Sequence, residues 1–231
     1  MHEIRKTSPR RRVSSLLATT LAAGLATLSA GCFQQILLLG YLIAGPPSIE
    51  PPFEIMTKES LTDKNVTVAV VCVVPKEVEF LSTVKIDQEI ARYVSHRLAV
   101  KKIEVVTPDR VRRWLIQNPE WIKPDEIGKY FKTTYVIFID VQDFNLYEKS
   151  SQTIFRGRAE VNVEVWKMDD DGEGDKIFSQ RLTSQYPLAV GKPVTSITYT
   201  IFQRKYLARL SEEIGRMFYE HYNGDDMIDV M

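Results

Sequence analysis

Apolar residues along the chain fall into two kinds of pattern, continuous runs and regular repeats. Residues 66–74 and 135–139 are continuous apolar runs in which β-branched residues are frequent. A strand that is buried on both faces of a sheet has this composition. We therefore predict two central strands at these positions, and a shorter strand at residues 103–106.

Helices are predicted between these strands, because apolar residues recur there at steps of three and four. The clearest repeat lies in residues 86–98, after the first central strand. Pro108 and Pro124 are each predicted to open a shorter helix, since proline is tolerated in the first turn, where its missing N–H is not needed. A strand, a helix and a second strand in this order predict a parallel pair with a right-handed crossover.

The second half of the chain changes to a period of two. Apolar residues alternate with polar ones in residues 159–166 and again in residues 178–186, which predicts antiparallel strands with one face on the core. A helix is predicted from about residue 195 to residue 222, and an acidic tail, residues 224–231, follows it. The element order is β-α-β-α-α-β-β-β-α. We therefore expect an α/β (α+β) fold with a mixed sheet of about five strands and helices on one or both faces.

The first 31 residues have the features of a secretory signal peptide. Five basic residues precede residue 13, and a weakly apolar run rich in Ala, Ser and Thr follows them. This run is less apolar than a membrane-spanning helix, which needs about 20 strongly apolar residues. Ser29-Ala30-Gly31-Cys32 resembles the bacterial lipobox, with the usual aliphatic residue displaced by one position to Leu28. The resemblance implies that Cys32 is lipidated and begins the mature chain; ordinary cleavage that leaves a free thiol is the alternative.

Cys32 is followed by an apolar segment and then by a proline-rich one. Residues 32–44 contain a nearly unbroken apolar run that is too short to cross a bilayer, so we expect this segment to lie at the membrane interface beside the lipid. The alternative is that it packs on the folded domain. Residues 45–64 begin with four prolines, which disfavour helices and central strands, and are predicted to form a tether. The globular domain is predicted to occupy residues 65–223.

The charge of the chain bears on its partners, and its cysteine content bears on its reactivity. The whole chain has no net charge, but removal of residues 1–31 leaves a net charge of about −4. No cluster of lysine, arginine and aromatic residues follows the signal, so binding to nucleic acid is not expected. The second cysteine, Cys72, lies within a predicted buried strand, where we expect it to act as a small apolar side chain of low reactivity.

Residues that could carry chemistry are few. We find no nucleophile-and-base motif, and His96 and His221 lie on separate predicted helices, so we expect no enzyme activity, no cofactor and no metal site. The acidic stretch 169–175 lacks the glutamate that ends a calcium-binding loop and is interpreted as a hairpin turn. Aromatic residues are numerous, and they either pack at the sheet edges or form an exposed patch for a partner. They are Tyr130, Phe131, Tyr135, Phe144, Tyr147, Phe155, Tyr186, Tyr199 and Phe202.

The element order, mounted on a lipoprotein signal, resembles a domain shared by three kinds of bacterial envelope protein. These are the curli-secretion lipoprotein, the lipoprotein activators of penicillin-binding proteins and the N-terminal domain of the translocation protein TolB. The resemblance covers about residues 66–222 and rests on element order, with no shared motif residue. One departure is the loop 147–153, which is short and polar, whereas a curli-type pore builds its wall from hairpins with an apolar outer face.

Together these features predict a lipid-anchored protein of the bacterial cell envelope that faces the periplasm. We expect a non-catalytic module that binds, regulates or supports another envelope protein or a transport complex. The alternative is a self-assembling lipoprotein associated with secretion or a pore, as in curli secretion, which would be a homo-oligomer. Phe33 stands where an aspartate would favour retention in the inner membrane, so the outer membrane is favoured.

Overall fold

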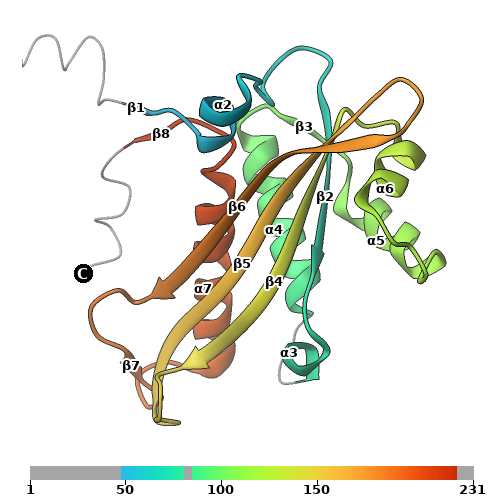
Figure 1. Cartoon of the computed structure of the whole chain (residues 1–231). Coiled ribbons are helices and arrows are strands. Elements are labelled where there is room, and N and C mark those ends of the chain that lie inside the picture. Colours follow the sequence, from blue (N-terminus) through green and yellow to red (C-terminus); the bar gives the residue numbers. More distant parts are fainter. Residues whose placement is uncertain (1–47, 81–84, 223–231) are drawn as a thin grey trace, which may run out of the picture. The chain divides into compact units, whose positions relative to one another are not determined.

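The computed structural model describes residues 48–80 and 85–222, whose arrangement is drawn in Figure 1. These residues belong to one compact unit that begins at Ser48. Cys32, the predicted signal peptide, the predicted interfacial segment and the acidic tail lie outside the described residues. The predictions made for those segments therefore stay predictions.

A mixed sheet forms the centre of the domain, in the strand order β3-β2-β4-β5-β6, with the short β7 paired to β5. β2 pairs in parallel with β3 and with β4, whereas β4, β5 and β6 are antiparallel neighbours. The predicted α/β (α+β) class and its mixed sheet are confirmed. The strands are β2 (Thr67–Val73), β3 (Glu104–Val105), β4 (Tyr135–Tyr147), β5 (Ile154–Met168), β6 (Gly174–Tyr186) and β7 (Lys192–Pro193).

Helices cover both faces of the sheet (Figure 1). α4 (Ile86–Val100) and α7 (Tyr199–Gly215) pack against each other on one face, over the larger core. α5 (Pro108–Gln117) and α6 (Pro124–Phe131) pack on the other face, over a smaller core beside β2 and β4. A short helix, α3 (Lys76–Phe80), follows β2. No helix in the described ranges is both long and apolar enough to cross a membrane.

The domain begins earlier in the chain than the sequence predicts. Ser48–Ile49 form β1, which pairs with β8 (His221–Tyr222), and Pro52–Thr57 form the helix α2. This helix starts with a proline, which is tolerated in the first turn, and the side chain of Phe53 is fully buried. Residues 48–64 are thus folded onto the domain and are not part of a tether. The physical reason is that burial of their apolar side chains offsets the poor helix propensity of a proline-rich segment.

A carboxylate fixes the segment after α2 to the sheet. Glu59 accepts a hydrogen bond from the Tyr135 hydroxyl at 2.7 Å and another from the Lys167 ammonium. Burial alone would raise the pKa of Glu59, but the hydrogen bonds from Lys167 and Tyr135 together outweigh it. The pKa of Glu59 is therefore lowered from its ordinary value of 4.5.

Replacement of Glu59 by glutamine is expected to destabilise the domain by less than about 1 kcal/mol at neutral pH, because the ion pair with Lys167 is partly exposed. Since the folded-state pKa is lowered, the charged form contributes stability above pH 4.5, and this contribution is lost as the pH falls through the folded-state pKa. The difference between wild type and Glu59→Gln should therefore shrink on acidification. Urea unfolding at decreasing pH measures it, and a constant difference would contradict the prediction.

The C-terminal helix is shorter than predicted. α7 ends at Gly215, and the chain then turns to reach β8. Met217 and Phe218 remain buried beyond the helix, because they pack against α2. The N–H of Phe53 donates to the Met217 carbonyl at 3.0 Å, and the rings of Phe53 and Phe218 are in contact. His221 accordingly lies in β8 and not on a helix.

Candidate functional site

The loop that follows β6, residues 187–191, exposes two aliphatic side chains. Leu188 is 63% exposed and Val190 is 79% exposed. The loop leaves β6 after Tyr186 and returns at β7, which pairs with residues 154–155 at the start of β5. Both ends of the loop are therefore attached to strands of the sheet.

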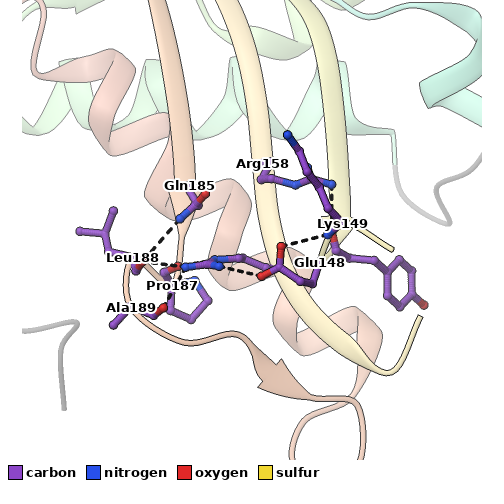
Figure 2. A network of polar contacts seen from close by, with 9 residues as sticks. Glu148, Lys149, Arg158, Gln185, Pro187, Leu188 and Ala189 are labelled. Atoms are coloured by element: carbon purple, nitrogen blue, oxygen red, sulfur yellow. Dashed lines mark hydrogen bonds and ion pairs between the residues drawn. The ribbon is translucent and has the colours of Figure 1, made fainter. Parts of the chain in front are cut away.

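The side chain of Arg156 on β5 binds the main chain of this loop, in the network drawn in Figure 2. Its guanidinium donates to the carbonyl oxygens of Pro187, Leu188 and Ala189 at 3.3, 2.8 and 2.8 Å. Arginine carries five donors in a rigid planar fork, so one side chain can bind several acceptors in a fixed geometry. The backbone of the loop is held, while the side chains of Leu188 and Val190 remain in solvent.

Glu148 completes the network from the turn between β4 and β5. Its carboxylate accepts from Nη1 of Arg156 at 2.7 Å and from the main-chain N–H of Lys149 at 2.9 Å. These two hydrogen bonds, with that of Arg156 the stronger cause, lower the pKa of Glu148. Arg158 donates to the Tyr147 carbonyl at 3.1 Å and so joins the end of β4 to β5. The network therefore connects the 187–191 loop to the β4–β5 turn.

Aromatic rings form a packed layer beneath this network. Phe202 of α7 stacks on Phe155 at a centroid distance of 5.0 Å and on Tyr186 at 6.0 Å. A hollow of about 420 Å³ lies at the same end of the domain, and a hollow of this size can receive apolar side chains of a partner. Its lining includes Phe144, Leu146, Tyr147, Gln152 and Tyr199.

Two lysines lie at the same end of the domain as the loop. Lys149 is exposed in the β4–β5 turn, and the Lys192 ammonium lies 5.9 Å from the centre of the Tyr186 ring. The nearby carboxylate of Glu148 is already paired with Arg156. A surface that complements this end of the domain would offer an apolar pocket for Leu188 and Val190 with carboxylates around it.

The structure decides between the two interpretations of the aromatic residues. Packing in the core is confirmed for most of them, since Tyr135, Phe144, Phe155, Tyr186 and Phe202 are buried. Tyr130 is exposed on α6, where its ring lies against Trp114 and Phe131. Phe155, Tyr186 and Phe202 therefore pack beneath the 187–191 loop, and the aromatic residues do not themselves form one exposed patch.

The acidic stretch 169–175 forms the turn between β5 and β6, as predicted. The Asp169 carboxylate accepts from the N–H of Glu173 at 2.7 Å, and Gly172 has a φ of +79°, a conformation that favours glycine. Among the residues that the structure describes, no group of three His, Cys, Asp or Glu side chains is placed to hold a metal ion.

Cys72 is buried in β2, as predicted, beside a hollow between α4 and α5. Burial raises the pKa of its thiol well above the ordinary value, and the carboxylates of Asp87 and Asp140 raise it further. The thiolate is the reactive form of cysteine, so these surroundings favour the inert apolar role.

Cys32, which the sequence predicts as the lipidation site, lies outside the described residues. Arg156, in contrast, is a residue that the sequence does not single out. Its carbonyl partners lie 31 to 33 positions further along the chain. The alternating pattern of β5 places Arg156 on the outward face, and Pro187 marks a loop, but no local signal links the two.

Comparisons with known proteins give weak similarities. No protein-family model matches the chain, and no curated protein matches its sequence. The structure of lipoprotein GNA1162 from Neisseria meningitidis is 13% identical, with a TM-score of 0.38, and the match covers 64% of this chain and 98% of that one. The PelC dodecamer structure from Paraburkholderia phytofirmans is 12% identical, with a TM-score of 0.42 and coverage of 76% and 97%. The hypothetical protein CT253 from Chlamydia trachomatis is 12% identical, with a TM-score of 0.41 and coverage of 65% and 95%. These values are too low for a functional assignment.

Proposed function

We propose that this protein is a lipid-anchored protein of the bacterial cell envelope that binds another envelope protein without catalysing a reaction. Cys32 carries the lipid, the folded domain faces the periplasm, and the outer membrane is the favoured location. The 187–191 loop is the surface that the partner recognises. The domain therefore serves as a membrane-attached binding or scaffold module.

The anchoring of the 187–191 loop by Arg156 is the observation that supports this proposal most strongly. Three of its carbonyl groups are bound by Arg156, while two aliphatic side chains project from it into solvent. A flexible loop loses conformational entropy when it binds, whereas a loop that is already held loses less. Exposed apolar side chains on a fixed backbone are thus suited to insertion into a partner's pocket.

The loop and the start of the folded domain lie at opposite ends of β6, as Figure 1 illustrates. The domain begins at β1 and α2, and Phe53 of α2 contacts Phe178 near the start of β6. The loop begins after Tyr186, roughly 26 Å further along the same strand. The loop and Ser48, the first residue of the folded domain, are therefore far apart along the sheet.

Substitution of both Leu188 and Val190 by serine is expected to reduce recovery of the partner about tenfold or more, because two buried aliphatic contacts are lost. Both side chains are exposed, so stability should change by less than about 0.5 kcal/mol. The measurement is affinity isolation of the full-length lipidated protein from membranes in mild detergent, with quantification of co-isolated proteins by mass spectrometry.

Ile201→Ser is the matched control for this experiment, because Ile201 is also exposed but lies on α7 outside the loop.

Arg156→Lys is a second test, since lysine keeps the charge but lacks the planar fork that holds three carbonyl groups. Partner recovery should fall in this variant although Leu188 and Val190 are present. Equal recovery by the wild type and the Leu188→Ser, Val190→Ser variant, or failure to recover any partner in several detergents, would contradict the proposal.

A further inference from the structure

Helices α5 and α6 expose basic and apolar side chains next to each other. Arg110 and Arg113 of α5 are exposed, and with Gln117 they line a hollow of about 80 Å³ that Tyr130 of α6 borders. Tyr130 is 62% exposed, and Ile116, one helical turn along α5 from Arg113, is 67% exposed. These five residues are called the α5–α6 face. They come from two helices, so no single stretch of the sequence contains this face.

Aromatic rings fix the position of side chains on this face. The ring of Tyr130 lies against Trp114 at a centroid distance of 6.0 Å and against Phe131 at 4.9 Å. The guanidinium of Arg110 lies 5.3 Å from the centre of the Phe131 ring. A guanidinium that stacks on a ring keeps its N–H donors in its own plane, where they can bind another acceptor. Arg110 is therefore held beside the hollow with donors to offer.

The two arginines of the α5–α6 face have no carboxylate partner in the described part of the chain. Arginines elsewhere in the domain are paired with glutamates, and these are Arg92, Arg97, Arg156, Arg181, Arg209 and Arg216. The described lining of the hollow contains no acidic residue. Asp109 of α5 lines a different hollow, between α4 and α5. The charge of the face therefore complements an anion.

We propose that the α5–α6 face binds the membrane surface and receives the phosphate groups of anionic phospholipids. The planar fork of arginine matches the oxygens of a phosphate, so Arg110 and Arg113 can bind one phosphate at the hollow. Ile116 and Tyr130 enter the headgroup region, where the aliphatic side chain leaves water and the tyrosine hydroxyl stays hydrated. Basic and apolar side chains together on one helical surface are typical of contact with a membrane interface.

α6 and the start of the folded domain lie at the same end of the sheet (Figure 1). The absence of a side chain at Gly128 lets α6 approach Met168, the last residue of β5. Glu59, which follows α2, pairs with Lys167, the residue before Met168. The domain begins at Ser48, shortly before α2. The chain therefore enters the domain at the end of the sheet on which α6 packs.

The length of chain before Ser48 brings a bilayer within reach of this end. If Cys32 carries the lipid, as proposed above, the chain from residue 32 to Ser48 can span up to ~50 Å when extended. Attachment also raises the effective concentration of the α5–α6 face at the membrane, so that weak binding to lipid headgroups is sufficient. The inference therefore rests on the proposed lipid anchor. Partner binding by the 187–191 loop is not required for it.

A spin label at position 116 tests contact with the bilayer. Full-length lipid-anchored Ile116→Cys protein is labelled and placed in vesicles of neutral phosphatidylcholine, with or without anionic phosphatidylglycerol. In the anionic vesicles we expect the label to be protected from a water-soluble relaxation agent and accessible to oxygen, which concentrates in lipid. Ile201→Cys is the matched control, because Ile201 is exposed on α7, which covers the other face of the sheet. The native Cys72 is buried and should not be labelled.

Removal of two charges tests recognition of phosphate. In the labelled Ile116→Cys protein, Arg110→Gln with Arg113→Gln should lower the ratio of bound to free face about tenfold or more, since each basic side chain contributes to attraction by an anionic surface. Arg204→Gln with Lys205→Gln is the matched control. It removes the same charge from exposed positions on α7 and should leave the ratio unchanged. Urea unfolding of both double variants confirms that they are folded.

Three results would overturn the proposal. They are a label at position 116 that stays in water in anionic vesicles, equal protection in neutral and anionic vesicles, and an equal loss of protection in the two double variants. Flotation of the vesicles on a density gradient separates this failure from failure of the lipid anchor. Protein that floats with the vesicles while its label stays in water keeps the anchor and disproves contact of the α5–α6 face with lipid.

Discussion

Replacement of Phe53 by alanine is expected to lower the free energy of unfolding by about 3–5 kcal/mol. The Phe53 side chain is fully buried, and its ring contacts Tyr135, Phe178 and Phe218 at centroid distances of 5.7 to 5.9 Å. These partners come from β4, β6 and the segment after α7. Alanine would leave a cavity where these elements meet, and the surrounding side chains could collapse into it only in part.

Ile55→Ala is the matched control for Phe53→Ala, because Ile55 lies on the same helix with its side chain about half exposed. This control should cost less than about 1 kcal/mol. Urea unfolding of both variants, followed by tryptophan fluorescence, measures the difference. A similar loss for the two variants would mean that α2 is not part of the core, and that residues 48–64 behave as the tether that the sequence predicts.

Replacement of Cys32 by serine is expected to move most of the protein from the membrane fraction to the soluble fraction. Serine has no thiol to carry the lipid, and the apolar run that follows position 32 is too short to cross a bilayer. An interfacial segment without a lipid holds a protein only weakly, since stable anchoring takes two hydrophobic signals. Fractionation of cells, followed by a carbonate wash of the membranes, measures the distribution.

The second cysteine provides the control for this experiment. Cys72→Ala removes a buried thiol from β2 and should leave the membrane fraction unchanged. Mass spectrometry of the mature N-terminal peptide would identify the modification on Cys32 directly. If Cys32→Ser protein stays in the washed membranes to the same extent as the wild type, the lipid anchor is disproved.

The central strands could be predicted from the sequence because burial on both faces leaves a local signature. Ala69, Val71, Ile137 and Ile139 are all buried, and the runs that contain them became β2 and β4. Local pattern was insufficient for α2, whose stability depends on contacts with residues more than 80 positions away, such as Tyr135 and Phe178. The four prolines of this segment predict a tether, and no local pattern indicates that Phe53 is buried.

The candidate site could not be predicted for a related reason. Arg156 has the exposed-face position of an ordinary surface arginine in an alternating strand. Its role depends on the path of the chain after β6, which brings the carbonyl groups of Pro187, Leu188 and Ala189 within its reach. Every residue type has a main-chain carbonyl group that can accept a hydrogen bond, so the loop sequence does not predict these hydrogen bonds.

The pairing of β1 with β8 determines how the domain would carry mechanical load. Ser48 lies opposite Tyr222 and Ile49 lies opposite His221, so a pull transmitted through the proposed lipid anchor would arrive at a ladder of two residues. Force applied at the end of an antiparallel pair opens its hydrogen bonds one after another, so this short ladder would yield first. The long ladders between β4, β5 and β6 would bear tension only after β1 had separated from β8 and the chain had detached as far as α2. Separation of β1 from β8 would therefore protect the sheet from the first load.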